Sequence, residues 1–114
     1  MPADLPLARS RSEQFEDLVQ EVVARLQRRL PERLGAVEVL VADVPPPGGD
    51  LRLADTSPAS AGRPARVVIY RRPIETRVSG ERIRAALLND LLVEELAALL
   101  GVDPESLDPD YGRD

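Results

Sequence analysis

Four carboxylates near the end of this chain have the clearest potential for chemistry. They are Glu94, Glu95, Asp103 and Asp108. Carboxylate oxygens bind hard cations such as Ca²⁺, Mg²⁺ and Mn²⁺, so a metal site built from oxygen ligands is one interpretation. Their spacing does not follow an EF-hand loop, and acids near the C-terminal end of a helix oppose the helix dipole. We therefore favour the second interpretation, in which they are solvated surface acids and hold no metal.

The absence of two residue types limits the chemistry further. The 114 residues include no His and no Cys. Zinc sites need nitrogen or sulfur ligands, usually two or more, and thiol chemistry needs Cys. A carboxylate that acts as a general base without a metal still needs a polarised water and an oxyanion stabiliser, which no motif here provides. The composition therefore predicts a protein without a cofactor.

Two long helices are expected to position these acids. Ser10 and Glu13 have the spacing of a capping box at the start of the first helix. The apolar residues that follow recur at helical spacing and are Phe15, Leu18, Val19, Val22, Val23, Leu26 and Leu30. Pro31 is expected to end or kink this helix. The second helix is expected to be capped by Ser79 and to end at Gly101, and its many leucines favour burial.

Short β-branched segments provide the strands. Residues 37–44 and 66–70 are predicted strands, and the second has apolar residues on both faces, which is typical of a central strand. Residues 71–75 are expected to continue as extended chain or as an edge segment, because their proline cannot donate to a strand ladder. Residues 103–105 predict a short helical turn. The resulting fold class is α+β, with two main helices packed on a small mixed sheet.

The predicted organisation is a single domain over residues 10–108. Residues 1–9 are expected to be a flexible N-terminal tail, and residues 109–114 a C-terminal tail. Residues 45–64 include three consecutive prolines and a Gly-Gly pair, and are predicted to form a long loop without regular structure.

Charge is distributed unevenly along the chain. All fifteen basic residues are Arg, and the net charge is −5. Residues 63–84 contain seven Arg and two acids, whereas residues 85–114 contain one Arg and eight acids. We expect these segments to pair with each other, within one chain or across a homodimer. No aromatic stacking platform and no nucleic-acid motif accompany these arginines, which argues against nucleic-acid binding. The lack of a signal segment and of a long apolar run predicts a cytoplasmic protein without membrane contact.

Three segments together resemble the small zincin-like metallopeptidase family. The segment Glu94-Glu95-Leu96-Ala97-Ala98-Leu99-Leu100-Gly101 resembles the metal-binding helix of that family. Tyr70-Arg71-Arg72-Pro73 and Asp43-Val44-Pro45-Pro46-Pro47 are similar to the family's segments that precede the helix and follow the first strand. The family helix carries two His four residues apart, with a Glu beside the first. Here the Glu and Gly of the family motif are present, but Glu94 and Ala98 occupy the His positions.

The resemblance implies the minimal zincin-like fold over roughly residues 12–112. In the family, the two His bind Zn²⁺ and the Glu acts as general base on the metal-bound water. Glu95 therefore stands at the position of a relict general base. Asp108 lies near the position of the third family ligand. Because both His are lost, the resemblance implies a family member without zinc peptidase activity.

Three functions are open at this point. The favoured one is a non-catalytic binding or regulatory protein that keeps the family's cleft as a surface for a protein partner. The second is a metallohydrolase with an atypical carboxylate site. The third is a small structural protein that oligomerises through helix 79–100. The sequence leaves a monomer and a homodimer equally open.

Overall fold

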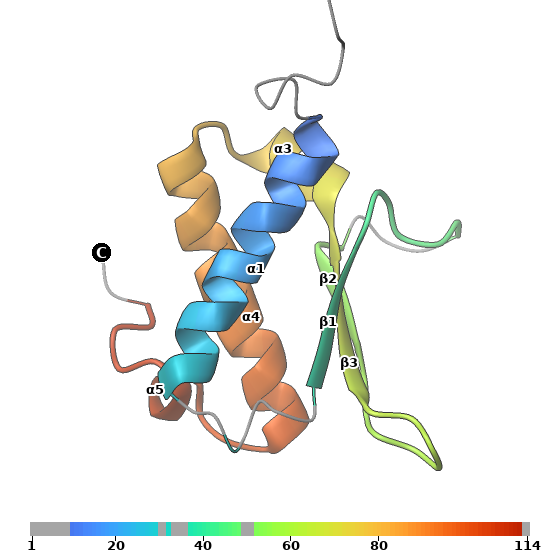
Figure 1. Cartoon of the computed structure of the whole chain (residues 1–114), viewed down its shortest axis with the longest axis vertical. Coiled ribbons are helices and arrows are strands. Elements are labelled where there is room, and N and C mark those ends of the chain that lie inside the picture. Colours follow the sequence, from blue (N-terminus) through green and yellow to red (C-terminus); the bar gives the residue numbers. More distant parts are fainter. Residues whose placement is uncertain (1–9, 30–31, 33–36, 49–51, 113–114) are drawn as a thin grey trace, which may run out of the picture.

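The structure, a computed structural model, describes residues 10–29, 32, 37–48 and 52–112. Its elements in chain order are α1 (Arg11–Arg29), β1 (Val37–Ala42), β2 (Ala54–Ser57), β3 (Ala65–Tyr70), α3 (Arg71–Arg77), α4 (Glu81–Leu100) and α5 (Pro104–Leu107). Helices α1 and α4 lie side by side against one face of the sheet (Figure 1). The predicted α+β fold is therefore confirmed. Among the described residues, no helix has the length and apolar character that a membrane span requires.

The capping box at the start of α1 is confirmed. The Ser10 hydroxyl accepts the Glu13 backbone N–H at 3.1 Å, and the Glu13 carboxylate accepts the Ser10 backbone N–H at 3.0 Å. The predicted apolar stripe faces the core, with Phe15, Leu18, Val19, Val22 and Leu26 buried. The expected end of this helix at Pro31 and the expected tail over residues 1–9 lie outside the described residues.

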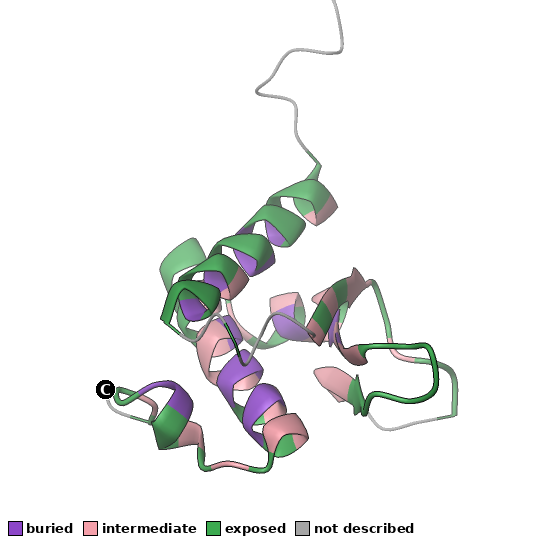
Figure 2. Cartoon of the chain, turned by 60° about the horizontal axis from the view of Figure 1, so that its bottom comes forward, coloured by how far each residue is buried: buried purple, intermediate pink, exposed green. Residues whose placement is uncertain are grey.

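The sheet is mixed and has the strand order β1-β3-β2. Strand β1 runs parallel to β3, with Val37 opposite Ala65, and β2 runs antiparallel to β3, with Ala54 opposite Ile69. The predicted central position of β3 is confirmed. Val67 and Ile69 are fully buried beneath the helices. The core therefore lies between one face of the sheet and the pair α1 and α4 (Figure 2).

The prediction of a structureless loop over residues 45–64 is wrong in its second half. Residues 54–57 form β2, and Ser60 and Arg63 exchange backbone hydrogen bonds of 2.8 and 3.1 Å that close the turn to β3. The sequence of β2 is Ala-Asp-Thr-Ser, which has no strand-like apolar pattern. It becomes a strand because it pairs with β3, which is rich in β-branched residues. The local sequence of residues 54–57 does not reveal this partner.

The expected extended chain after β3 is also wrong, because residues 71–77 form helix α3. Pro73 is the third residue of this helix, where a backbone N–H has no intrahelical acceptor, so its missing donor costs nothing. The Arg71 guanidinium contacts the Glu75 carboxylate at 2.8 Å, one helical turn away. This ion pair further stabilises the helix.

The cap of helix α4 lies one residue later than predicted, and the helix itself begins at Glu81. Gly80 occupies the cap position at φ 89° and makes no side-chain cap bond, so the prediction that Ser79 is the cap is wrong. At the other end, Gly101 adopts the left-handed conformation at φ 69° and donates its N–H to Ala97, as predicted. The leucine-rich faces are buried within the chain, and Ile83 is an exposed large apolar residue of this helix at 58%.

The C-terminal segment is more ordered than the predicted tail. Helix α5 begins at Pro104, as expected, and leads into a turn over residues 109–112. Tyr111 packs against the hydrophobic core. Residues 109–112 therefore belong to the folded domain.

The expected pairing of residues 63–84 with residues 85–114 is not found within one chain among the described residues, and pairing across a homodimer stays a prediction. Arg66 pairs with Glu38 at 3.0 Å, and Arg71 pairs with Asp43 at 3.1 Å. These acids come from β1 and the chain that follows it. The charges of the C-terminal third are consequently not neutralised by the arginine-rich segment in the described structure.

Candidate functional site

The residues that resemble a metal-binding motif lie in the second half of α4. Glu94 and Ala98 are four residues apart, so they share one face of the helix, and both are exposed. Glu95 is half-buried on the neighbouring face, on the helix that packs against β2. Sequence reasoning placed Glu95 on a solvated surface, and the structure corrects this, since much of its side chain is removed from water.

Burial and negative neighbours change the acidity of Glu95. Burial raises the pKa of its carboxyl above the ordinary value of 4.5, because the charged form loses hydration. The charges of Glu94 and Asp55 raise the pKa further, since they repel a carboxylate at this position. A half-buried carboxyl with a raised pKa is common at functional sites and also occurs where a side chain is merely packed.

Arg52, Asp55 and Tyr70 form a connected polar group, the Asp55 cluster, and the charge of its Asp55 acts on Glu95. The Arg52 guanidinium contacts one Asp55 oxygen at 2.7 Å, and the Tyr70 hydroxyl donates to the other. The Arg52 guanidinium also lies 5.8 Å from the centre of the Tyr70 ring, within cation–π range. The hydrogen bonds from Arg52 and then Tyr70 lower the pKa of Asp55, so this carboxyl is ionised at neutral pH.

The carboxylate of the candidate metal ligand Asp108 accepts hydrogen bonds from three other residues. Only 6% exposed, it accepts hydrogen bonds from Asn89 at 2.9 Å, from the Asp110 backbone N–H at 3.0 Å and from Arg29 at 3.2 Å. Burial by itself would raise the pKa of Asp108, but these three donors outweigh it and hold the pKa below 3.8. Asp108 thus joins α1, α4 and the C-terminal turn.

The positions of Asp108 and Glu94 on α4 explain why they do not meet. Asp108 reaches α4 through Asn89, and residues 89 and 94 point in directions that differ by roughly 140° around a helix of 3.6 residues per turn. Glu94 instead accepts a hydrogen bond from the Tyr111 hydroxyl, which raises the pKa of Tyr111 to about 12. The two candidate ligands therefore face different surroundings.

The remaining candidate ligand, Asp103, is exposed and precedes α5. Its backbone carbonyl accepts hydrogen bonds from the Ser106 N–H at 3.0 Å and the Ser106 hydroxyl at 2.7 Å. Within the part of the chain that the structure describes, no three acids come together in a group that could hold a metal ion. With no His and no Cys in the sequence, the residues at the motif do not fit zinc.

Two of the segments that carried the resemblance contact each other. The Arg71 guanidinium contacts the Asp43 carboxylate, and the Arg72 backbone N–H donates to the Asp43 carbonyl at 3.0 Å. These contacts join the end of β1 to the start of α3. The Tyr-Arg-x-Pro and Asp-Val-Pro segments thus act together as one connection that places α3 and α4 against the sheet.

The family sequence model that describes a zincin-like metallopeptidase matches residues 34–113 of this chain. The chain belongs to the zincin-like metallopeptidase family. The match covers the sheet and the helices from α3 onward, whereas α1 lies before it. A comparison with curated proteins found no match. The family membership that the sequence resemblance implied is confirmed, although the matched range begins later than the roughly residue 12 that was expected.

Two site residues of this zincin-like protein were missed by sequence reasoning. Arg52 and Asp55 belong to the segment that was predicted to be structureless, and they contact Tyr70 only because β2 pairs with β3. Tyr70 itself was noted in the family-like Tyr-Arg-x-Pro segment. A search for strand partners of β3 is the one signal that would have pointed to Asp55.

The raised pKa of Glu95 in this zincin-like protein predicts a pH-dependent stability effect. We expect Glu95→Gln to increase the free energy of unfolding at neutral pH, by less than about 1 kcal/mol. The charged carboxylate is disfavoured in the folded state, so the gain is present above the folded pKa and disappears below the unfolded value of 4.5. Urea unfolding at about pH 8 and about pH 3.5 measures both limits.

A matched control is Glu21→Gln on α1, where the exposed Glu makes the same change in charge. We expect no comparable pH-dependent gain from that variant. A Glu95→Gln protein that is less stable than the parent at neutral pH would show that the Glu95 carboxylate makes a favourable contact.

Proposed function

We propose that this zincin-like protein has lost zinc peptidase chemistry and acts as a non-catalytic binding protein. The observation that carries the proposal is the state of the former ligand positions. Glu94 is bound by Tyr111, Ala98 has no donor atom, and Asp108 is enclosed by three hydrogen-bond donors. A working general base at Glu95 needs an activated water. Among the described residues, no group of acids comes together to hold a metal ion that would activate one.

The surface proposed to bind a partner is the region of Glu95 and the Asp55 cluster. It presents a half-buried acid beside an edge strand, since β2 pairs with β3 on one side only in the described sheet. An extended peptide can add to a strand edge through main-chain hydrogen bonds, and its side chains then determine specificity. We therefore propose a protein partner that provides an extended segment with a basic side chain toward Glu95.

The first arm of the experiment measures metal and activity. Untagged protein is incubated with Zn²⁺, Mn²⁺ or Ca²⁺, passed through a desalting column and analysed for metal, and then assayed against a mixed peptide substrate. We expect bound metal to stay at background level, below about 0.1 equivalent per chain, because a stable site needs several converging ligands. Retention of one equivalent, with hydrolysis that Glu95→Gln abolishes, would instead support the carboxylate-site metallohydrolase.

The second arm measures binding. An array of extended peptides with systematically varied charge is probed with the parent protein, with Glu95→Gln and with Glu21→Gln. We expect basic peptides to bind the parent and the Glu21 variant, and to bind Glu95→Gln about tenfold more weakly, which is the loss of one charge-assisted hydrogen bond. Equal binding of the peptides to all three proteins would show that Glu95 is not part of the binding surface.

A further inference from the structure

Two adjoining cavities lie where the start of α1, helix α3 and the start of α4 meet. The first has a volume of about 590 Å³, and its charged lining residues are Arg11, Glu75, Glu81 and Arg84. The second has a volume of about 650 Å³ and is lined by Arg11, Arg71, Arg72 and Glu75 among others. Because Arg11 and Glu75 line both, the two cavities form one region, which we call the arginine junction.

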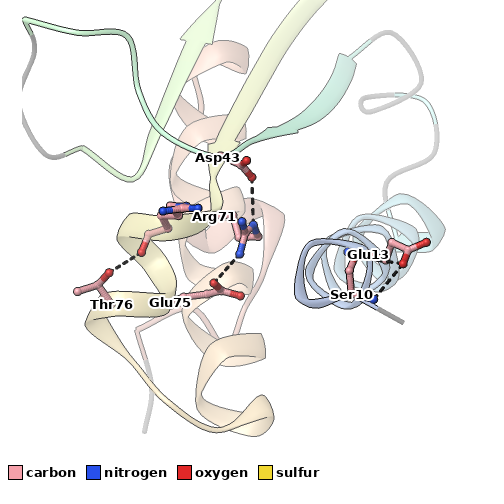
Figure 3. A network of polar contacts seen from close by, with 7 residues as sticks. Ser10, Glu13, Asp43, Arg71, Glu75 and Thr76 are labelled. Carbon is pink, nitrogen blue, oxygen red and sulfur yellow. Dashed lines mark hydrogen bonds and ion pairs between the residues drawn. The ribbon is translucent and has the colours of Figure 1, made fainter. Parts of the chain in front are cut away.

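One arginine of this junction is already neutralised. The Arg71 side chain is only 11% exposed and lies between two acids, with Asp43 at 3.1 Å and Glu75 at 2.8 Å (Figure 3). Asp43 directly follows β1, and Glu75 belongs to α3. Among the described residues, these two acids form ion pairs with Arg71 and with no other arginine.

The other three arginines of the junction are not paired within the part of the chain that the structure describes. The side chains of Arg11, Arg72 and Arg84 make no ion pair or hydrogen bond there. The Nε atom of Arg84 is also buried and has no hydrogen-bond partner. A buried N–H without an acceptor is unfavourable, and it is rare in folded proteins unless a water or ligand completes it.

Two further features make the junction positive. The cap residue of helix α4 is Gly80, which has no side chain that could accept from the first-turn N–H groups. The charged residues lining the two cavities are four Arg and two Glu, in a chain whose net charge is −5. Glu81 at the first turn of α4 is exposed and offsets only part of this charge.

We propose that the arginine junction binds the phosphate group of a small phosphorylated molecule. Guanidinium groups match phosphate oxygens in paired hydrogen bonds, and unpaired arginines with an open cavity provide both donors and space. The volume of each cavity falls within the range of about 300–1,000 Å³ that is typical of small-molecule sites. Arg84 and Glu95 lie about 16 Å apart along α4 at 1.5 Å per residue, so this site is separate from the proposed partner surface.

The test uses inorganic phosphate as the probe on the full chain. Isothermal titration at constant ionic strength is compared for the parent protein, Arg11→Gln, Arg84→Gln and the control Arg82→Gln. Arg82 is exposed on the same helix and does not line either cavity. We expect saturable binding by the parent and by Arg82→Gln, and about tenfold weaker binding by each of the other two, as expected for one lost charge-assisted bond.

A second readout follows the Arg84 Nε–H directly by ¹H–¹⁵N NMR. We expect its resonance to shift on addition of phosphate and to stay in place with chloride at equal ionic strength. Should Arg84→Gln fold poorly, Arg11→Gln and the NMR shift still decide the outcome. Phosphate binding that is equal in Arg11→Gln and Arg82→Gln, or an Arg84 resonance that does not respond, overturns the proposal. So does binding of a short single-stranded oligonucleotide without any binding of phosphate, which would indicate a nucleic-acid surface.

Discussion

We expect the double variant Glu94→His with Ala98→His to bind Zn²⁺ at least about 100-fold more tightly than the unsubstituted chain. Zinc sites with four protein ligands release about 10–16 kcal/mol, which is a few kcal/mol for each ligand. Residues 94 and 98 are exposed and share one face of α4, so two imidazoles there can bind one ion. The substitutions therefore provide the donors that the chain lacks.

Thermal unfolding with and without Zn²⁺, followed by addition of a chelator, measures this gain. Zinc at 100 times its dissociation constant stabilises the folded state by about 2.7 kcal/mol. Ala98→His alone is the control, and we expect it to bind zinc weakly because one ligand is missing. Equal zinc affinity of the single and double variants would show that positions 94 and 98 cannot act together. We expect no peptidase activity in the double variant, since Asp108 faces another side of α4 and is held by Arg29 and Asn89.

The second large effect concerns Asp108. We expect Asp108→Ala to lower the free energy of unfolding by about 2–3 kcal/mol, because each hydrogen bond to a charged group contributes about 1.5–3 kcal/mol and the exposed Arg29 can rehydrate. The Asn89 amide and the Asp110 backbone N–H lose their acceptor in this variant. Urea unfolding at neutral pH measures the loss.

The pKa of Asp108 determines the pH range of this effect. The pKa in the folded state is below 3.8, so the stabilisation is present above 3.8 and is lost as pH falls through the folded value. The difference between parent and Asp108→Ala should therefore shrink in acid. Asp110→Ala is the control, since it removes an exposed carboxylate and keeps the backbone donor. A stable Asp108→Ala protein that loses a bound metal would instead identify Asp108 as a ligand.

These two predictions separate the former metal motif from the structural role of its surroundings. The two positions where this chain lacks the family's His are exposed on α4, and substitution there disturbs little of the core. The acid near the third ligand position is buried and stabilises the C-terminal turn. In this zincin-like protein, separate residues therefore occupy the family's metal-binding positions and support the fold.

Several features of this protein follow from the sequence alone. The capping box and apolar stripe of α1, the two β-branched strands and the glycine at the end of α4 are local signals, and the structure contains all of them. The absence of zinc donors is also certain from composition, since folding cannot supply nitrogen or sulfur ligands that the chain lacks. The family resemblance rests on short contiguous segments, and a match over residues 34–113 confirms it.

Other features depend on contacts between distant parts of the chain, and only the tertiary structure decided them. Strand β2 has no intrinsic strand pattern and forms because β3 offers it a partner. Asp55 accepts a hydrogen bond from Tyr70, which lies 15 residues away in the sequence. Asp108 accepts one from Arg29, which lies 79 residues away. The environment of a carboxylate is determined by such neighbours, which is why sequence reasoning identified Glu95 and Asp108 as candidates but could not tell that one is half-buried and the other structural.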